Sequence, residues 1–431
     1  MSLWLFLAAS GAVAADLDGE GLFGEGQLAV SEDFEIRYWT SDRVLEGFED
    51  RPRLFDYVEQ VSRTNLLFSK DSVQVGLQFD EVMLLGNRYY LDDVLQYERS
   101  IVPGDLLSTA PDQFLNLDKI FIKRKFGRKA TVQVGDHYAA FGRGLALNVI
   151  KNTDIDIDTS LRGVQSTIRQ GDWQFTAALG LTNQQQVAQD NPNLDIRPNV
   201  NHLVAGGRLD LYDVGPGNWG LHGVLYQFAR EDVTEDPLDA FAQDLDVVVV
   251  GATTELSGLG GLDWYLEGDW FHYTSGELLG KEEAEDGLAL YGSTAAYLGA
   301  VTMFVEAKHY KNTEGVNALT GPEGYELASG PTLEYERVIT EDSAAAVNSN
   351  DISGVKVRFD WMKGAWVPHF EVSVSRDNEL GGLHFNESPE TIVHPVLGAD
   401  HFGQTFQLLV NGGYRIDLRD EHGADRLAHF D

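Results

Sequence analysis

Alternation of apolar and charged positions is the dominant pattern along this chain, and the interval 352–376 shows it in one place. In the heptapeptide 355–361, VKVRFDW, every odd-numbered position is apolar and every even-numbered position is charged. Successive side chains of a β-strand point to opposite faces, so this segment has one apolar and one charged face. After a break at 362–365 the alternation resumes. The pattern predicts a hairpin with an apolar side and a hydrated side.

The same two-strand unit recurs along most of the chain. Apolar and polar side chains alternate in early strands at 34–38 and 63–80, in hairpins at 120–138, 162–182, 202–230, 244–273, 288–311 and 352–376, and in a last strand at 402–419. In the strand 262–273, for example, Leu262, Trp264 and Leu266 share one face and Asp263 and Glu267 the other. Repetition of this unit predicts an all-β chain of antiparallel hairpins.

The connections between these strands alternate strictly between short and long. Tight turns are expected at Lys70, Gly127, Gly171, Gly215, Gly258, Gly299 and Gly364, and long connections at 85–116, 139–161, 183–201, 231–243, 275–286, 312–351 and 378–401. Outer-membrane β-barrels have this organisation, with short periplasmic turns and long extracellular loops. We therefore expect a transmembrane antiparallel β-barrel of about 16 strands, within a range of about 14–18, with both ends periplasmic.

Membrane physics favours this prediction over a soluble all-β protein. Backbone groups in hydrocarbon have no water to bond, so a membrane sheet must close on itself, and a tilted strand of about 9–11 residues crosses the bilayer. Aromatic residues near strand ends fit interfacial girdles: Trp173, Trp219, Trp270, Tyr273, Tyr291, Trp361 and Trp366. The alternative is a soluble solenoid or double sandwich, in which the apolar faces meet a second sheet.

The register of the hairpin 120–138 follows from its side chains. A three-residue loop at 127–129 places Lys123 and Lys125 beside Gln133 and Thr131, whereas a two-residue turn places Lys123 beside Val132. Because a one-residue slip moves a whole strand to the opposite face, we expect the three-residue loop. Arg124 then lies on the apolar face, where snorkelling at an interface can hydrate it.

The N-terminus resembles an export signal. Residues 1–15 combine an apolar segment with the small-residue site Ala12-Val13-Ala14, although no Lys or Arg precedes it; a short buried helix is the alternative. The expected organisation is a signal peptide at 1–15, a periplasmic lead-in at 16–31 and a barrel at 32–419. Residues 420–431 are either a periplasmic tail or the start of a missing strand.

Composition narrows the class further. The 431 residues carry a formal net charge of -36, contain no cysteine, and have no apolar run of the length of a transmembrane helix beyond the N-terminus. The acidic balance argues against nucleic acid as a partner, because phosphate binding needs clustered Lys and Arg. We found no nucleophile-elbow, metalloprotease or dinucleotide motif, so we expect neither an enzyme nor a cofactor.

The segment 134–147, VGDHYAAFGRGLAL, resembles a family of uncharacterised bacterial outer-membrane β-barrels. That family carries a Gly-x-x-Tyr-x-x-Phe-Gly-x-Gly-Leu pattern where a strand passes into a loop, and the segments 304–310 and 331–334 are also similar to it. The resemblance implies a porin-like barrel in the outer membrane of a Gram-negative bacterium and implies no established activity.

Charged residues on the polar faces are the candidate functional set. We expect them to line a hydrated lumen, because unpaired charges in a dry core are very costly. They either set solute preference or merely pair across strands. The candidates are Lys123, Lys125, Arg208, Asp210, Glu267, Asp269, Glu306, Lys308, Lys356, Arg358, Asp360 and Arg415.

A weaker candidate is the run Asp154, Asp156 and Asp158, whose alternate carboxylates could hold Ca²⁺ if the segment is extended. An EF-hand loop would need Gly where Thr159 stands and Glu where Gln165 stands, so that motif fails. A solvated loop or an ion pair with Arg143 or Arg162 is the favoured reading of the run.

Two functions remain open from the sequence. The first is a porin-like channel for small polar solutes or ions. The second is a non-conducting barrel that anchors or docks a secretion, motility or surface complex, with 85–116 and 312–351 as plug or docking surface. Expected partners are outer-membrane lipid and lipopolysaccharide, a protein partner in the second case, and divalent cations at acidic loops such as 231–236 and 282–286.

Overall fold

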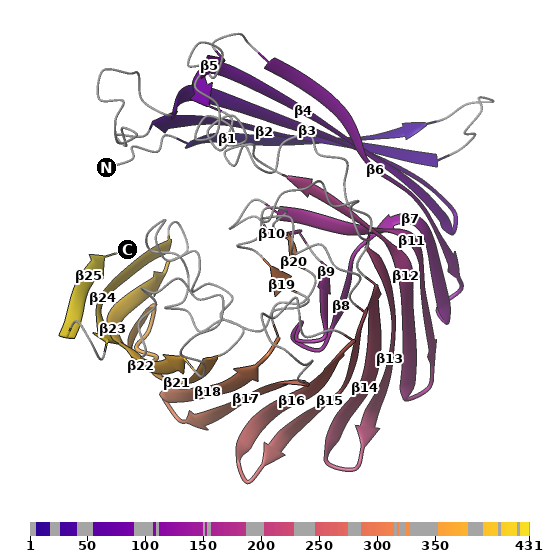
Figure 1. Ribbon diagram of the computed structural model, residues 1–431. Coiled ribbons are helices and arrows are strands. Elements are labelled where there is room, and N and C mark those ends of the chain that lie inside the picture. The colour runs from indigo at the N-terminus through magenta and orange to yellow at the C-terminus, as the bar shows by residue number, and fades with distance from the viewer. Residues whose placement is uncertain are drawn as a thin grey trace.

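A computed structural model gives the architecture shown in Figure 1. It describes residues 6–17, 26–40, 55–89, 107–108, 112–149, 151–152, 157–186, 202–227, 246–274, 286–313, 317–318, 325–326, 352–377, 391–403, 407–419 and 423–430. These residues form strands, turns and short irregular segments, and none of them is helical. Among them there is accordingly no helix that could cross a membrane.

One sheet of 21 strands dominates the fold. Two of its strands, β5 (Leu107–Ser108) and β10 (Lys151–Asn152), are only two residues long and extend the pairing of β4 and β11, which leaves 19 full-length strands. In sequence order these are β1 Phe6–Leu17, β2 Gly26–Thr40, β3 Phe55–Lys70, β4 Val73–Tyr89, β6 Asp112–Phe126, β7 Ala130–His137, β11 Ile157–Gln170, β12 Trp173–Gln186, β13 Leu203–Val214, β14 Gly217–Gln227, β15 Asp246–Leu259, β16 Leu262–Tyr273, β17 Gly287–Leu298, β18 Val301–Lys311, β21 Ile352–Trp361, β22 Trp366–Asp377, β23 Thr391–Phe402, β24 Gln407–Arg419 and β25 Gly423–Phe430.

Every full-length strand pairs antiparallel with the full-length strands before and after it in the chain. The prediction of an all-β chain of sequential antiparallel strands is therefore confirmed, but the predicted count of about 16 is too low. Residues 391–401, expected in a long connection, form most of β23, and residues 423–430 form β25. The N-terminal residues 6–17 form β1, which pairs with β2.

The expected tight turns are confirmed, and so is the register argued for the hairpin 120–138. Lys123 lies opposite Gln133 and Lys125 opposite Thr131 across a three-residue loop. Gly127 in that loop has φ 61°, a conformation that favours glycine. The Arg124 guanidinium lies 5.0 Å from the centre of the Phe126 ring, which explains how a cation is tolerated on the apolar face.

The two faces of the sheet differ in chemistry. One face exposes a broad apolar belt that includes Ile122, Val134, Leu179, Leu221, Val250, Leu266, Leu290, Val355, Phe370 and Val410. The opposite face is here called the inner face. The short strands β8 (Ala139–Phe141) and β9 (Leu147–Val149) lie on this side, inside the curve of the sheet (Figure 1). A second small pair, β19 (Asn317–Ala318) and β20 (Tyr325–Glu326), is also separate from the main sheet.

The sheet curves around its inner face, but its two end strands do not pair within the described residues. Figure 1 shows β1 and β25 as the first and last strands of the curve, and no register joins them in the described part of the chain. The fold is thus a strongly curved antiparallel sheet, and its closure into a barrel stays a prediction.

Candidate functional site

The inner face of β13 to β21 brings together most of the charged residues predicted to line a lumen. Those on β13, β16, β18 and β21 are buried or half-buried there: Arg208, Asp210, Glu267, Asp269, Glu306, Lys308, Lys356, Arg358 and Asp360. On β6, Lys123 is half-buried and Lys125 is exposed beside the turn. Arg415 belongs to β24, and its side chain lies outside the described ones.

One ion pair joins β18 and β21 on the inner face. Lys356 Nζ lies 2.9 Å from Glu306 Oε2, and the Tyr291 hydroxyl donates a hydrogen bond of 2.5 Å to Glu306 Oε1. Glu306 and Lys356 are both buried. Burial of the two charges is tolerable because each has its counter-charge within contact distance.

Further along β21, one cation faces several carboxylates. Arg358 lies 2.9 Å from Asp360, 3.8 Å from Glu371 on β22 and 3.8 Å from Asp400 on β23. His369 lies 3.7 Å from Asp400 as well. Among the described side chains at this place, three carboxylates surround one guanidinium, which is an excess of negative charge.

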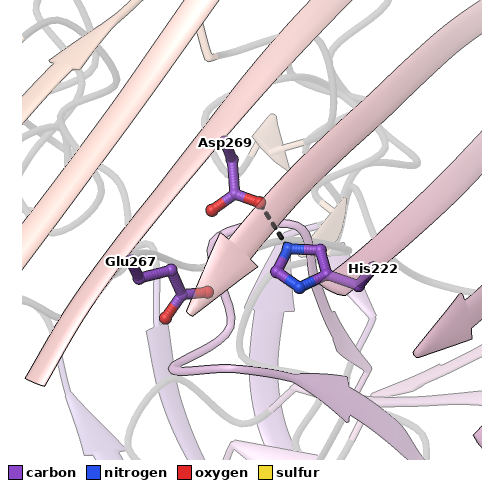
Figure 2. Close-up of side chains that lie close together, drawn as sticks. All are labelled: His222, Glu267 and Asp269. Atoms are coloured by element: carbon purple, nitrogen blue, oxygen red, sulfur yellow. Dashed lines mark hydrogen bonds and ion pairs between the residues drawn. The ribbon is translucent and has the colours of Figure 1, made fainter. Parts of the chain in front are cut away.

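A third network links β13, β14, β15 and β16. Arg208 donates hydrogen bonds to Asp210 at 2.7 Å and to Thr253 at 2.9 Å, and contacts Nδ1 of His222 at 3.2 Å. Nε2 of His222 lies 2.5 Å from Oδ1 of Asp269 (Figure 2). Because a guanidinium only donates, Nδ1 of His222 must accept, so the proton is on Nε2 and His222 donates it to Asp269.

The segment 139–149 is held against this network. The backbone N–H of Arg143 donates a hydrogen bond of 2.7 Å to Oε2 of Glu267, which also accepts from the Tyr265 hydroxyl. The Arg143 guanidinium lies 4.8 Å from the centre of the Tyr265 ring. The Tyr226 hydroxyl donates to the backbone oxygen of Ala146. The segment therefore lies on the inner wall and is anchored by β14 and β16.

Apolar packing fixes the same segment at the end of the strands opposite the tight turns. Phe141, Leu145, Ala146, Leu147 and Val149 pack in one buried cluster with inner-face side chains of neighbouring strands, among them Val204, Tyr226, Val249, Phe271, Tyr273, Tyr291 and Ile352. Tyr273 and Tyr291, predicted to join interfacial girdles, are instead buried in this layer. At the same end, just before β13, burial lowers the pKa of His202 to about 4, so its imidazole is neutral at pH 7.

The sequence did not predict that the segment 139–149 lies on the inner face or that a buried apolar cluster holds it there. The sequence placed 139–149 in an extracellular connection and expected a hydrated inner face along the whole strand length. A signal for the apolar layer is present in Val247-Val248-Val249-Val250, where alternation is lost. Val247 and Val249 are 0% exposed whereas Val250 is 52% exposed, so both faces of β15 are apolar at this end.

The aspartate run predicted as a weak Ca²⁺ candidate lies mostly outside the described residues. Asp154 and Asp156 are not described, and Asp158 belongs to β11 without a described side chain. The two arginines suggested as its ion partners have these contacts among the described residues. Arg162 pairs with Asp136 at 3.1 Å, and Arg143 contacts Glu267 and Tyr265.

Comparison with known proteins adds similarities of architecture. No family model matches the chain, and no curated protein matches it. Among solved structures, it is similar to a BenF-like porin from Pseudomonas fluorescens Pf-5, with 10% identity, a TM-score of 0.47, and 97% of this chain and 98% of that chain covered. It is also similar to two proteins of Pseudomonas aeruginosa: OccK9 (OpdG), with 11% identity, TM-score 0.46 and coverages of 100% and 97%, and OpdK solved with vanillate, with 10% identity, TM-score 0.45 and coverages of 94% and 96%.

Proposed function

We propose that this protein is a porin-like channel for small polar solutes or ions in the outer membrane of a Gram-negative bacterium. The single observation that carries the proposal is the division of the sheet into an exposed apolar face and an inner face of buried, paired charges. Apolar side chains in contact with acyl chains need no further cover, whereas ionic side chains there would be very costly.

The inner segment 139–149 acts as the narrow part of this channel. It is fixed to the wall by hydrogen bonds to Glu267 and from Tyr226, and by the apolar cluster, so it cannot swing freely across the opening. Solutes pass between this segment and the charged wall formed by β21, β22 and β23. Three carboxylates around Arg358 favour cations there.

Conductance measurement on the purified full-length protein in planar lipid bilayers tests the proposal. Discrete conductance steps with a preference for cations are expected. Absence of steps at every salt concentration, from protein that remains folded in the same lipid, would refute a channel.

The same structure supports a second candidate, a non-conducting barrel that anchors or docks a surface or secretion complex. Its supporting observation is the apolar cluster, which fills the inner side of β11 to β18 at the end opposite the tight turns. If segments outside the described residues fill the remainder, the barrel is plugged. Folded protein without conductance that co-purifies with a defined envelope partner would favour this candidate.

Lipopolysaccharide and divalent cations are the proposed non-protein partners, through acidic connections such as 282–286. Most of these residues lie outside the described ones, although Asp286 is described and pairs with His272 at 2.9 Å. We propose no enzymatic activity and no cofactor for transport, since diffusion through a charged passage needs neither.

A further inference from the structure

Three side chains of the inner wall converge behind segment 139–149: His222 from β14 and Glu267 and Asp269 from β16 (Figure 2). One nitrogen or oxygen atom from each lies within 4.8 Å of the others, and all three residues are buried. Glu267 and Asp269 are two apart on one strand, so their side chains share a face. Asp269 lies directly in line with His222 across β15, because both residues pair with Gly251.

The carboxylates of this group have unused acceptor capacity. Oε2 of Glu267 accepts two hydrogen bonds and Oδ1 of Asp269 accepts one, but Oε1 of Glu267 and Oδ2 of Asp269 are buried without a partner. Glu267 and Asp269 are 3% and 1% exposed, respectively. A buried carboxylate oxygen without a donor or cation is costly, so its place in a stable protein calls for a ligand.

Local charge leads to the same conclusion. The nearby cation Arg208 already pairs with Asp210 at 2.7 Å, and the neutral His222 adds no positive charge. Two carboxylates thus share one buried site without a full counter-charge. A divalent cation would balance both of them.

We propose that His222, Glu267 and Asp269 bind a divalent transition-metal ion such as Zn²⁺. One imidazole nitrogen and two carboxylates suit Zn²⁺ or Mn²⁺, whereas Ca²⁺ prefers six to eight oxygen ligands. Ligands of a tetrahedral Zn²⁺ site stand about 3.3 Å apart, given bond lengths of about 2.0–2.1 Å. To reach this separation from 4.8 Å, the ligand atoms of the three side chains must approach one another by only about 1.5 Å.

Metal binding requires one exchange of protons and hydrogen bonds. The metal takes the place of the proton on Nε2 of His222, and the imidazole stays neutral by carrying a proton on Nδ1 instead. That N–H can no longer accept from Arg208, so the 3.2 Å contact is lost. Arg208 keeps its bonds to Asp210 and Thr253. The metal then fixes Glu267, and with it the backbone of Arg143.

Zn²⁺ titration of the metal-stripped, full-length protein tests this site, with excess Ca²⁺ present to occupy surface carboxylates. The wild type is expected to bind one Zn²⁺ per chain with high affinity. Glu267→Gln and Asp269→Asn each remove one charge without changing shape and should weaken binding at least tenfold. The matched control is Glu255→Gln, which should bind Zn²⁺ as the wild type does. Glu255 is an exposed residue of the neighbouring strand β15, and its carboxylate accepts a hydrogen bond from Asn218.

Two further readouts make the result decisive. Co²⁺ substituted for Zn²⁺ should give a visible spectrum of nitrogen and oxygen ligation that Asp269→Asn alters, and circular dichroism should show that each variant is folded. Arg208→Gln should bind Zn²⁺ more tightly, because it removes the donor to Nδ1 and a nearby positive charge; weaker binding would overturn His222 as the nitrogen ligand. Equal Zn²⁺ affinity in the wild type and a folded Glu267→Gln, Asp269→Asn double variant would overturn the site.

Discussion

Glu306 on β18 and Lys356 on β21 stand directly opposite each other in the sheet and form a buried ion pair of 2.9 Å. Removal of one member leaves the other as an uncompensated buried charge, which typically costs about 3–5 kcal/mol of folding free energy. We expect Lys356→Met alone to destabilise the protein by roughly this amount. Denaturant unfolding in lipid vesicles measures the loss.

The paired substitution is the control for that experiment. Glu306→Gln with Lys356→Met removes both charges and should recover most of the lost stability, because no lone charge remains. If the double variant is as unstable as the sum of the single variants, the two side chains act independently and the interpretation of the pair is wrong.

Arg358 should control ion selectivity. It faces Asp360, Glu371 and Asp400, so Arg358→Gln raises the excess of negative charge on the inner wall. Under a salt gradient across a planar bilayer, the reversal potential should move toward stronger cation preference. Arg124→Gln changes a cation on the opposite face and should leave the reversal potential unchanged. A shift of equal size in both variants would contradict a role for the inner face.

If the apolar face contacts lipid, the loss of folding free energy caused by a charge on that face should depend strongly on its depth in the bilayer. Leu221 lies in the middle of β14 and is 58% exposed, whereas Leu259 lies beside a turn and is 51% exposed. Leu221→Arg should cost about 2–4 kcal/mol and Leu259→Arg about 0–1 kcal/mol, because a charge near the interface stays hydrated. Unfolding from vesicles measures both, and two equally small losses would favour a soluble protein.

Gly142 offers a way to displace the inner segment. A Cβ added there would meet Oε1 of Glu267 at 2.1 Å, and the residue has φ +60°. Gly142→Ala should therefore push 139–149 from the wall and change the single-channel conductance. Gly171→Ala is the matched control, with φ +56° and open space around it. It shares the backbone strain of about 1–2 kcal/mol and should leave conductance unchanged.

The strands that the sequence predicts well are those in which charged side chains all lie on one face and apolar side chains on the other. In the hairpin of β21 and β22, Lys356 pairs with Ser373 and Arg358 with Glu371, as the alternation requires. The hairpin 120–138 was likewise determined by its charges, because only one register keeps the lysines together.

Strand β23 shows where this reasoning fails. It contains Pro395, which has no backbone N–H, and its ladder with β24 skips His394 and Pro395. Histidine and proline interrupt the alternation, so the sequence pattern predicts no strand there. The inner segment 139–149 was missed for a different reason: its position is determined by contacts with strands far along the chain, such as that between Arg143 and Glu267, 124 residues apart.

The number of full-length strands has a consequence for how the sheet can close. A ring in which every neighbouring pair is antiparallel needs an even number of strands, because with an odd number the first and last strands run in the same direction. Within the described residues the sheet has 21 strands including the two short ones, and so 19 full-length ones. Removal of the expected export signal would delete most of β1, free the edge of β2 and leave that strand antiparallel to β25, so that maturation of the N-terminus would permit the ring to form.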